Sequence, residues 1–213
     1  MLSNFLKTSY SDFFKTIIIL GLLAGVFLNE SIAQTQILFL GDSLSEGQGL
    51  DEELSFPRLV ERNLKSKNFN VAVTNGGVSG STSASGVTRL KWHLKKKIDV
   101  LVLELGANDG LRGLKLEETQ KNLIEIIKHA KEKKVKVLLL GLLMPPNYGK
   151  KYVDDFEKMY STIAKSEKVP FLPFVLNDVA GKSELNLPDG IHPNAKGHEI
   201  VAKTVTNFVE KNL

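Results

Sequence analysis

The chain contains no cysteine among its 213 residues. This absence excludes disulfide bonds, a thiol nucleophile and any metal site built on thiolate ligands. The hydrophobic content of 42% and the charged content of 24% are those of an ordinary soluble globular protein. A chain of this length can bury a substantial core, so its stability must come from that core rather than from covalent cross-links.

The sequence also lacks a strong charge imbalance. Its 28 basic and 24 acidic residues leave a net charge of only +4. The basic residues are spread over segments with helical patterns, which we interpret as solvated helix faces, and nothing resembles a nucleic-acid-binding stripe. There is no internal repeat, low-complexity tract or interdomain linker. We therefore expect one domain, residues 34–213, after a distinct N-terminal segment.

That N-terminal segment has the pattern of an export signal. Lys7 and Lys15 precede an uncharged stretch at residues 16–28, and small residues ending in Ala33 supply a cleavage site. As a helix, the stretch would span about 20 Å, against about 30 Å for the hydrocarbon core of a bilayer. We expect residues 1–33 to be a signal peptide, which would make the mature protein periplasmic or secreted. An uncleaved membrane anchor is the alternative.

From residue 34 onward, short apolar runs alternate with amphipathic helical patterns. The runs predict strands at 36–40, 71–75, 100–104, 135–140 and 171–174. The periodic segments predict helices at 56–65, 87–96, 116–133, 153–167 and 194–211. This alternation predicts an α/β fold with a five-stranded parallel sheet covered by helices on both faces. Ligands bind at the carboxyl ends of the strands in such sheets.

Ser43 follows the first expected strand, within Gly41-Asp42-Ser43-Leu44, where the chain must turn toward a helix. A serine hydroxyl becomes a nucleophile only with a base within hydrogen-bond reach. Taken alone, Ser43 could also cap the next helix or belong to a phosphate loop. The lysine and the longer glycine frame of a phosphate loop are absent here.

A base and an acid stand close together near the other end of the chain. His192 precedes Pro193, and Asp189 lies three residues earlier in a turn. From that position the carboxylate can hold one imidazole nitrogen while the other nitrogen faces Ser43. We therefore predict that Ser43, His192 and Asp189 are nucleophile, base and acid.

Such a site also needs hydrogen-bond donors for a developing oxyanion. Gly80 follows the second expected strand and can present an unobstructed backbone N–H. Asn108 follows the third strand and offers a side-chain amide, and the backbone N–H of Ser43 is a third candidate. Without the serine and histidine, these two positions would be ordinary turn residues.

No metal site is predicted. The candidate carboxylates, Glu104, Asp109 and Asp189, have no ligand-like spacing to a histidine, and Asp109 is interpreted as a turn or helix-cap residue. The remaining histidines lie in helical stretches without a carboxylate partner, and we interpret them as surface residues: His93, His129 and His198.

Four segments resemble the conserved blocks of the SGNH (GDSL) hydrolase family: residues 41–44, the segment around Gly80, residues 106–109 and residues 189–193. They occur in the family order and cover essentially the whole mature chain. The resemblance implies a flavodoxin-like three-layer α/β/α fold and a serine hydrolase without a cofactor. It also implies the same catalytic and oxyanion residues that the spacing predicts.

Within the family, the resemblance is strongest to exported bacterial hydrolases of acyl thioesters, aryl esters and lysophospholipids. It implies short- to medium-chain acyl substrates, and substrate contacts at Leu111, Pro146 and Asn147. We expect a monomer with a small-molecule substrate, and no nucleic acid or stable membrane partner after signal cleavage. Ser81 departs from the pattern, because an acidic residue is expected there.

Several apolar residues lie in segments that could wall an acyl groove: Leu111, Leu114, Leu116, Leu142, Leu143 and Met144. For Leu142 and Leu143, a place in the core is an equal alternative. Two other functions remain open from the sequence. One is a carbohydrate acetylesterase of the same family, and the other is a non-enzymatic binding module on the same fold.

Overall fold

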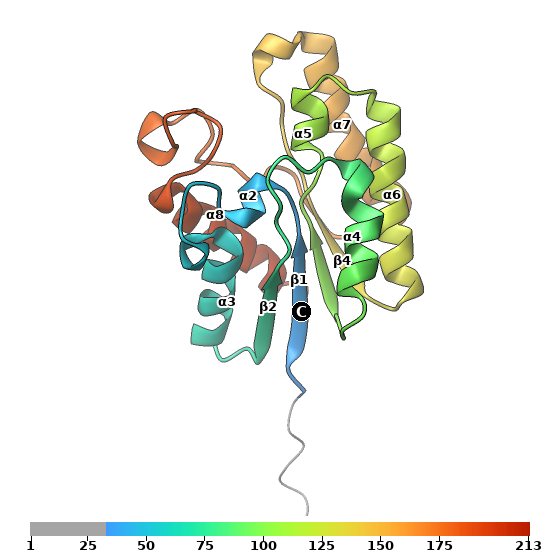
Figure 1. The fold of residues 1–213 in the computed structure, drawn as a ribbon, viewed down its shortest axis with the longest axis vertical. Coiled ribbons are helices and arrows are strands. Elements are labelled where there is room, and N and C mark those ends of the chain that lie inside the picture. Colours follow the sequence, from blue (N-terminus) through green and yellow to red (C-terminus); the bar gives the residue numbers. More distant parts are fainter. Residues whose placement is uncertain (1–32) are drawn as a thin grey trace, which may run out of the picture. The chain divides into compact units, whose positions relative to one another are not determined.

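Five parallel strands form the centre of the fold, in the order β2–β1–β3–β4–β5 (Figure 1). The structure is a computed structural model that describes residues 33–213, so the expected signal peptide lies outside the described residues except for Ala33. The strands are β1 (Thr35–Leu40), β2 (Val71–Asn75), β3 (Val100–Leu103), β4 (Lys136–Leu140) and β5 (Phe171–Leu172). Every neighbouring pair is parallel, which confirms the predicted sheet.

Helices cover both faces of this sheet and complete three layers. Helices α3 and α8 pack together on one face, while α4, α6 and α7 lie on the other (Figure 1). The helices are α2 (Ser43–Glu46), α3 (Phe56–Ser66), α4 (Gly86–His93), α5 (Ala107–Leu111), α6 (Leu116–Glu132), α7 (Lys150–Glu167) and α8 (Ala195–Glu210). Single 3₁₀ turns are η1 (Glu52–Leu54), η2 (Ser83–Ser85), η3 (Pro146–Tyr148) and η4 (Ser183–Leu185).

The central strands are buried on both sides, as their continuous apolar sequences predict. All four residues of β3 are buried, and so are the last four of β1. Helix α6 presents residues three and four apart to the sheet, and these are also buried: Leu123, Ile126, Ile127 and Ala130. Burial of this apolar surface is the main stabilising term of a cysteine-free domain.

The order of the strands places two loops beside each other at one edge. The chain moves from β1 outward to β2, then crosses over β1 to β3, so the direction of winding reverses between β1 and β3. The crevice at the carboxyl ends of two such strands is the usual ligand site of a doubly wound sheet. The loops that follow β1 and β3 carry Ser43 and Asn108.

The short elements differ from the sequence expectation. Helices α2 and α5 were not predicted, because four or five residues are too few to show helical periodicity. Strand β5 ends at Leu172 rather than at Phe174. Pro173 follows it, and proline has no N–H to continue the ladder. Within residues 33–213, no helix is both long enough and apolar enough to cross a bilayer.

The interpretation of His198 as a surface residue is wrong. His198 is 1% exposed, on the face of α8 that also buries Val201, Ala202 and Val205. Its Nδ1 accepts the backbone N–H of Phe56, at the start of α3, at 3.1 Å. Burial, together with the charge of His192, lowers the pKa of His198 to about 4, so its imidazole is neutral near pH 7.

This buried imidazole should make the fold sensitive to mild acid. The unfolded state takes up a proton near pH 6.5 and the folded state only near pH 4, so stability falls as the pH drops through this range, by up to about 3 kcal/mol. In His198→Asn, the amide oxygen can replace Nδ1 as acceptor without titrating. Melting temperatures at pH 7.5 and 4.5 should differ more for the wild type than for this variant. Equal differences would contradict the assignment.

Candidate active site

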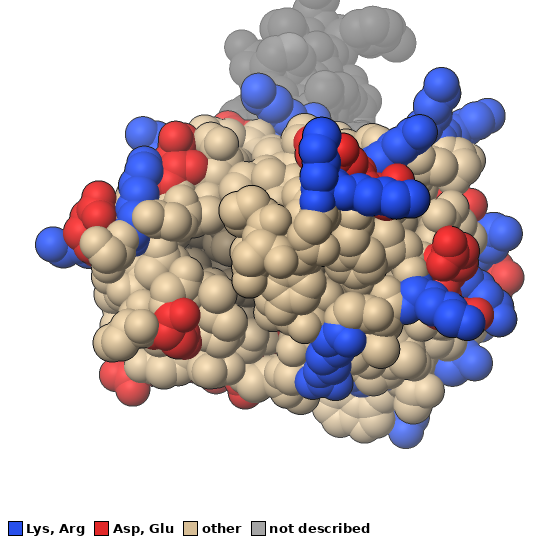
Figure 2. Space-filling model, turned by 90° about the horizontal axis from the view of Figure 1, so that it is seen from above, with Lys and Arg blue, Asp and Glu red and all other residues tan. Residues whose placement is uncertain are grey.

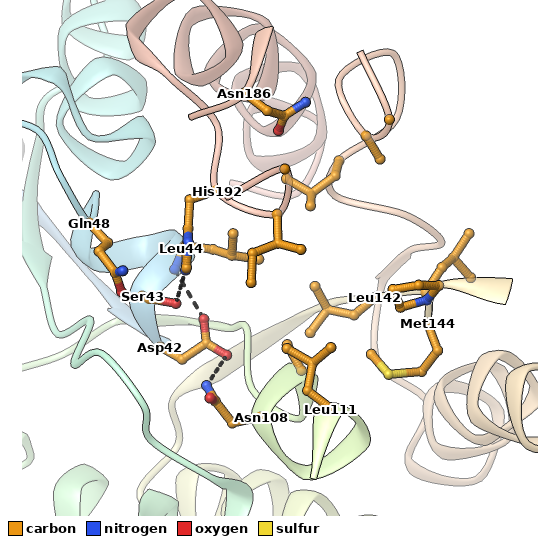
Figure 3. Close-up of a pocket in the computed structure, with 18 of the residues that line it drawn as sticks. Asp42, Ser43, Leu44, Gln48, Asn108, Leu111, Leu142, Met144, Asn186 and His192 are labelled. Carbon is orange, nitrogen blue, oxygen red and sulfur yellow. Dashed lines mark hydrogen bonds between the residues drawn. The ribbon is translucent and has the colours of Figure 1, made fainter. Parts of the chain in front are cut away.

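Ser43, His192 and Asp189 form a hydrogen-bonded chain at the carboxyl edge of the sheet. The Nε2 atom of His192 lies 2.8 Å from Oγ of Ser43 (Figure 3). Its Nδ1 atom lies 2.7 Å from Oδ2 of Asp189. The structure therefore brings together the three residues that the sequence proposed as nucleophile, base and acid, at the distances a proton transfer requires.

The loop that carries His192 also holds the carboxylate of Asp189 in place. Backbone N–H groups of Ile191 and His192 both donate to Oδ1 of Asp189 at 3.0 Å. The loop is closed by the Leu187 N–H, which donates to the His192 carbonyl at 2.7 Å. Burial opposes ionisation of Asp189, but these N–H groups and the His192 ring outweigh it and lower the pKa of the carboxyl. An ionised Asp189 can orient the imidazole and stabilise its positive charge.

Ser43 is the first residue of α2, and its position follows from the way that helix starts. The side chain of Asp42 caps the helix by accepting the Leu44 N–H at 3.0 Å. Gly41 lets the start of α2 pack directly against the end of β3, since a Cβ there would lie 2.5 Å from Oε2 of Glu104 and 2.0 Å from Oγ of Ser45. The proposed nucleophile thus lies at the start of a short helix that packs against the end of the sheet.

The two predicted oxyanion residues line the same cavity as Ser43. Asn108 lies in the first turn of α5, and its amide donates to Oδ2 of Asp42 at 3.2 Å (Figure 3). Gly80 has a φ of +74°, a conformation that favours glycine. Its carbonyl accepts from Nη2 of Arg112 at 2.9 Å. This bond links the Gly80 loop to the residue that ends α5.

Helix α2 also holds the loop that leads to Gly80. The carboxylate of Glu46 accepts the backbone N–H of Ser79 at 2.8 Å. On the same helix, the Ser45 carbonyl accepts from Nδ2 of Asn75 at 2.8 Å. Nucleophile and oxyanion candidates are therefore connected through direct hydrogen bonds rather than placed by independent loops.

Two buried carboxyl groups beneath Ser43 were not predicted as parts of the site. Glu104 is fully buried directly after β3, and its Oε2 accepts from Oγ of Ser45 at 2.7 Å and from the Asp42 N–H at 3.3 Å. Burial and the nearby Asp42 charge raise the pKa of Glu104 well above its ordinary value. Burial also raises the pKa of Asp42, to about 6, against hydrogen bonds from Leu44 and Asn108. Of the two carboxyl groups, Glu104 therefore holds its proton more tightly than it would in water, since it is fully buried beside the Asp42 charge.

Asp109 is neither a turn residue nor a cap of its own helix, which corrects the sequence interpretation. It is buried within the first turn of α5, where its carboxylate accepts from the N–H of Ser83 at 2.8 Å and from its Oγ at 2.5 Å. Thr119 of α6 donates to the same group at 3.2 Å. Asp109 therefore ties α5 to η2 and α6. Among the described residues, no three metal-ligating side chains cluster.

A cavity of about 590 Å³ opens beside Ser43. Leu142 and Met144 lie on its side away from Ser43 (Figure 3), and Leu111, Leu143 and Pro146 also line it. Seen from above, the hollowed end of the molecule is bordered mostly by uncharged residues, with charged side chains toward the periphery (Figure 2).

Three residues expected near an acyl chain do not line this cavity. Asn147 is exposed to solvent, and so is the side chain of Leu114. Leu116 packs against the core instead. The apolar lining therefore comes from Leu44, Leu111 and residues 142–146, and also from the segment after β5, where Phe174 and Leu176 were not singled out by the sequence analysis.

Known proteins resemble this chain over most of its length. The model of the GDSL-like Lipase/Acylhydrolase family matches residues 39–200. Esterase TesA of Pseudomonas aeruginosa is 38% identical over 180 residues, 84% of this chain and 90% of that protein. Thioesterase 1/protease 1/lysophospholipase L1 of Escherichia coli is 37% identical over 171 residues, 80% of this chain and 81% of that protein. A crystal structure of TesA aligns with a TM-score of 0.81 at 36% identity, covering 84% of this chain and all of that one.

The raised pKa of Glu104 can be tested through stability. The folded state holds this proton more tightly than the unfolded state, whose carboxyl ionises above about pH 4.5, so the contribution of Glu104 to stability is lost as the pH rises toward its raised pKa. Glu104→Gln is neutral at every pH and nearly isosteric with the protonated acid. From pH 5 to 8, the melting temperature of this variant should rise relative to the wild type. Glu118→Gln, at an exposed position of α6, is the matched control. A constant difference over this range would contradict the raised pKa.

Proposed function

The chain belongs to the GDSL-like lipase/acylhydrolase family and is an ester hydrolase, and from this premise we propose that Ser43, His192 and Asp189 hydrolyse acyl esters and thioesters through an acyl-enzyme intermediate. The observation that carries this proposal is the contact of 2.8 Å between Nε2 of His192 and Oγ of Ser43. A neutral imidazole at that distance can accept the serine proton as the oxygen attacks.

The proposed reaction has two halves. In the first, Oγ of Ser43 attacks the acyl carbonyl while His192 takes its proton at Nε2, and the alcohol or thiol leaves with that proton. In the second, His192 removes a proton from water, which attacks the acyl-enzyme and releases the acid. Asp189 holds the imidazole and offsets its charge in both halves.

The oxyanion of each tetrahedral intermediate is assigned to three donors: the backbone N–H groups of Ser43 and Gly80 and the amide of Asn108. Each such donor is worth about 10²–10³ in rate. The ionised Asp42 supports this role, because it accepts from one N–H of Asn108 and so fixes the orientation of that amide.

The shape and lining of the cavity support an acyl substrate. Its volume of about 590 Å³ lies within the usual range of small-molecule sites, roughly 300–1,000 Å³. The lining away from Ser43 is built of leucine, methionine and proline side chains, which suit an alkyl chain better than a sugar. We propose short- to medium-chain esters, aryl esters and thioesters, with lysophospholipids as further substrates.

The sequence before the domain supports export. Lys7 and Lys15 followed by the uncharged residues 16–28 form the pattern of a secretory signal. We propose that the enzyme acts in the periplasm or outside the cell, where acyl esters of lipids and small molecules are accessible.

Replacing Ser43 tests the nucleophile. Ser43→Ala should lower kcat/KM for p-nitrophenyl butyrate by about 10⁴-fold or more, because no other group can form the acyl-enzyme. It should also abolish labelling by a fluorophosphonate probe. Ser81→Ala, near Gly80 but outside the proposed triad, is the matched control and should keep the wild-type rate. A Ser43→Ala protein that melts like the wild type and still turns over the ester would exclude the proposal.

A second variant tests the acyl side of the cavity. Leu143→Trp adds bulk to the apolar lining, so kcat/KM for a p-nitrophenyl octanoate should fall at least about tenfold more than for the acetate. Leu114→Trp carries the same change at an exposed position outside the cavity and should leave the octanoate-to-acetate ratio unchanged. A ratio unaffected by Leu143→Trp would place the acyl chain elsewhere.

A further inference from the structure

The edge of the sheet opposite the active site carries a concentration of lysines. Parallel strands start where the preceding helices end, so the turns after α4 and α6 meet at this edge (Figure 1). Seven lysines lie in or beside these two turns, and all are exposed: Lys91, Lys95, Lys96, Lys97, Lys133, Lys134 and Lys136. We call this group, together with Trp92, the basic edge.

Direct contacts hold the two turns and the start of the domain side by side. The Lys136 N–H donates to the Asp99 carbonyl at 3.0 Å, which joins the turn after α6 to the turn after α4. The carboxylate of Asp99 accepts the Gln36 N–H of β1 at 2.8 Å. The start of β1 therefore lies next to the basic edge.

The charges of this surface are mostly uncompensated. Within the described residues, only Lys97 of the seven forms an ion pair, with Asp99 at 3.1 Å. Cations near helix C-termini interact favourably with the helix dipole. That effect fades within one turn, however, and Lys95, Lys96 and Lys97 all lie beyond the end of α4. Helix stability alone does not account for the cluster.

An exposed tryptophan lies within this cluster. Trp92, the sole tryptophan of the chain, is 64% exposed in the last turn of α4. Its ring contacts that of His93 edge-on. Tryptophan is enriched at the headgroup level of bilayers, where its ring is partly apolar and its N–H stays hydrated. Each lysine near an anionic leaflet adds about 1 kcal/mol of attraction.

We infer that the basic edge is a docking surface for an anionic phospholipid membrane, with Trp92 entering the headgroup region and the surrounding lysines binding lipid phosphates. One observation favours a membrane over a nucleic acid: the exposed indole of Trp92, a side chain that suits the headgroup region of a bilayer. This inference revises the expectation that no membrane partner remains after signal cleavage. Docking through this edge would leave the Ser43 cavity, at the opposite edge, open to solvent.

The fluorescence of Trp92 provides a direct test, because no other tryptophan contributes. The full chain is mixed with vesicles of phosphatidylcholine alone or with added phosphatidylglycerol. Anionic vesicles should shift the emission to shorter wavelength and protect it from acrylamide, and high salt should reverse both effects. The residues before position 33 also carry lysines, Lys7 and Lys15, so the charge-reversal pair described next is needed to assign the binding to the basic edge.

Charge reversal identifies the lysines responsible. Lys95→Glu combined with Lys96→Glu should weaken binding to anionic vesicles at least about 100-fold. The control pair, Lys182→Glu with Lys196→Glu, makes the same change of charge at exposed positions of the opposite edge and should bind like the wild type. Both pairs should retain hydrolysis of p-nitrophenyl butyrate, which separates this test from that of the active site.

Three outcomes would overturn the inference. One is an emission spectrum that anionic vesicles leave unchanged. Another is binding that the Lys95→Glu and Lys96→Glu pair does not weaken. The third is a shift produced by a DNA oligonucleotide but not by anionic vesicles, which would assign the surface to nucleic acid instead.

Discussion

The packing of α2 onto the buried end of β3 is the constraint on which the site depends. Gly41 brings the backbone so close to Glu104 and Ser45 that no Cβ fits there. A neutral Glu104 can accept the Ser45 hydroxyl and the Asp42 N–H without placing a second negative charge beside Asp42. The raised pKa of Glu104 thus favours a single negative charge at this position, on Asp42, which caps α2 and accepts from Asn108.

From this anchor, the other functional groups are positioned by successive hydrogen bonds. Helix α2 holds the Gly80 loop through Glu46 and Ser45, and Arg112 connects that loop to the end of α5. His192 comes from a part of the chain 149 residues away from Ser43. The loop of His192 also carries Asp189 and is closed by its own backbone hydrogen bond, so the contact with Ser43 is enough to place the base. The α2 side of the site therefore supplies the proposed nucleophile and oxyanion donors, and the loop at residues 187–193 supplies the proposed base and acid.

The fold was predictable because buried strands and amphipathic helices leave strong periodic signals in the sequence. The order of strands and loops then indicated that Ser43, Gly80 and Asn108 would meet at one end of the sheet. The residues that were missed share a physical property: their surroundings are formed by segments that lie far apart in the sequence. In the sequence, Glu104 has the pattern of a polar residue at the end of a strand, and His198 that of a polar residue on a helix. Both are buried only by the packing of the folded domain. His198 did leave a signal, since it shares a face with Val201, Ala202 and Val205. Asn147 shows the reverse case, because proximity in sequence to the cavity-lining Pro146 does not bring it into the cavity.

The parallel topology also divides the molecule into two chemically different edges. Loops that follow strands gather at one edge, where small residues and glycines allow close packing around a reactive serine. Turns that follow helices gather at the other, where exposed lysines lie in and beside the turns. Lysines that look dispersed along the sequence are therefore concentrated in space by the same winding that assembles the active site. Because the two edges lie at opposite ends of the strands, a contact at the basic edge can hold the protein on a surface without closing its cavity.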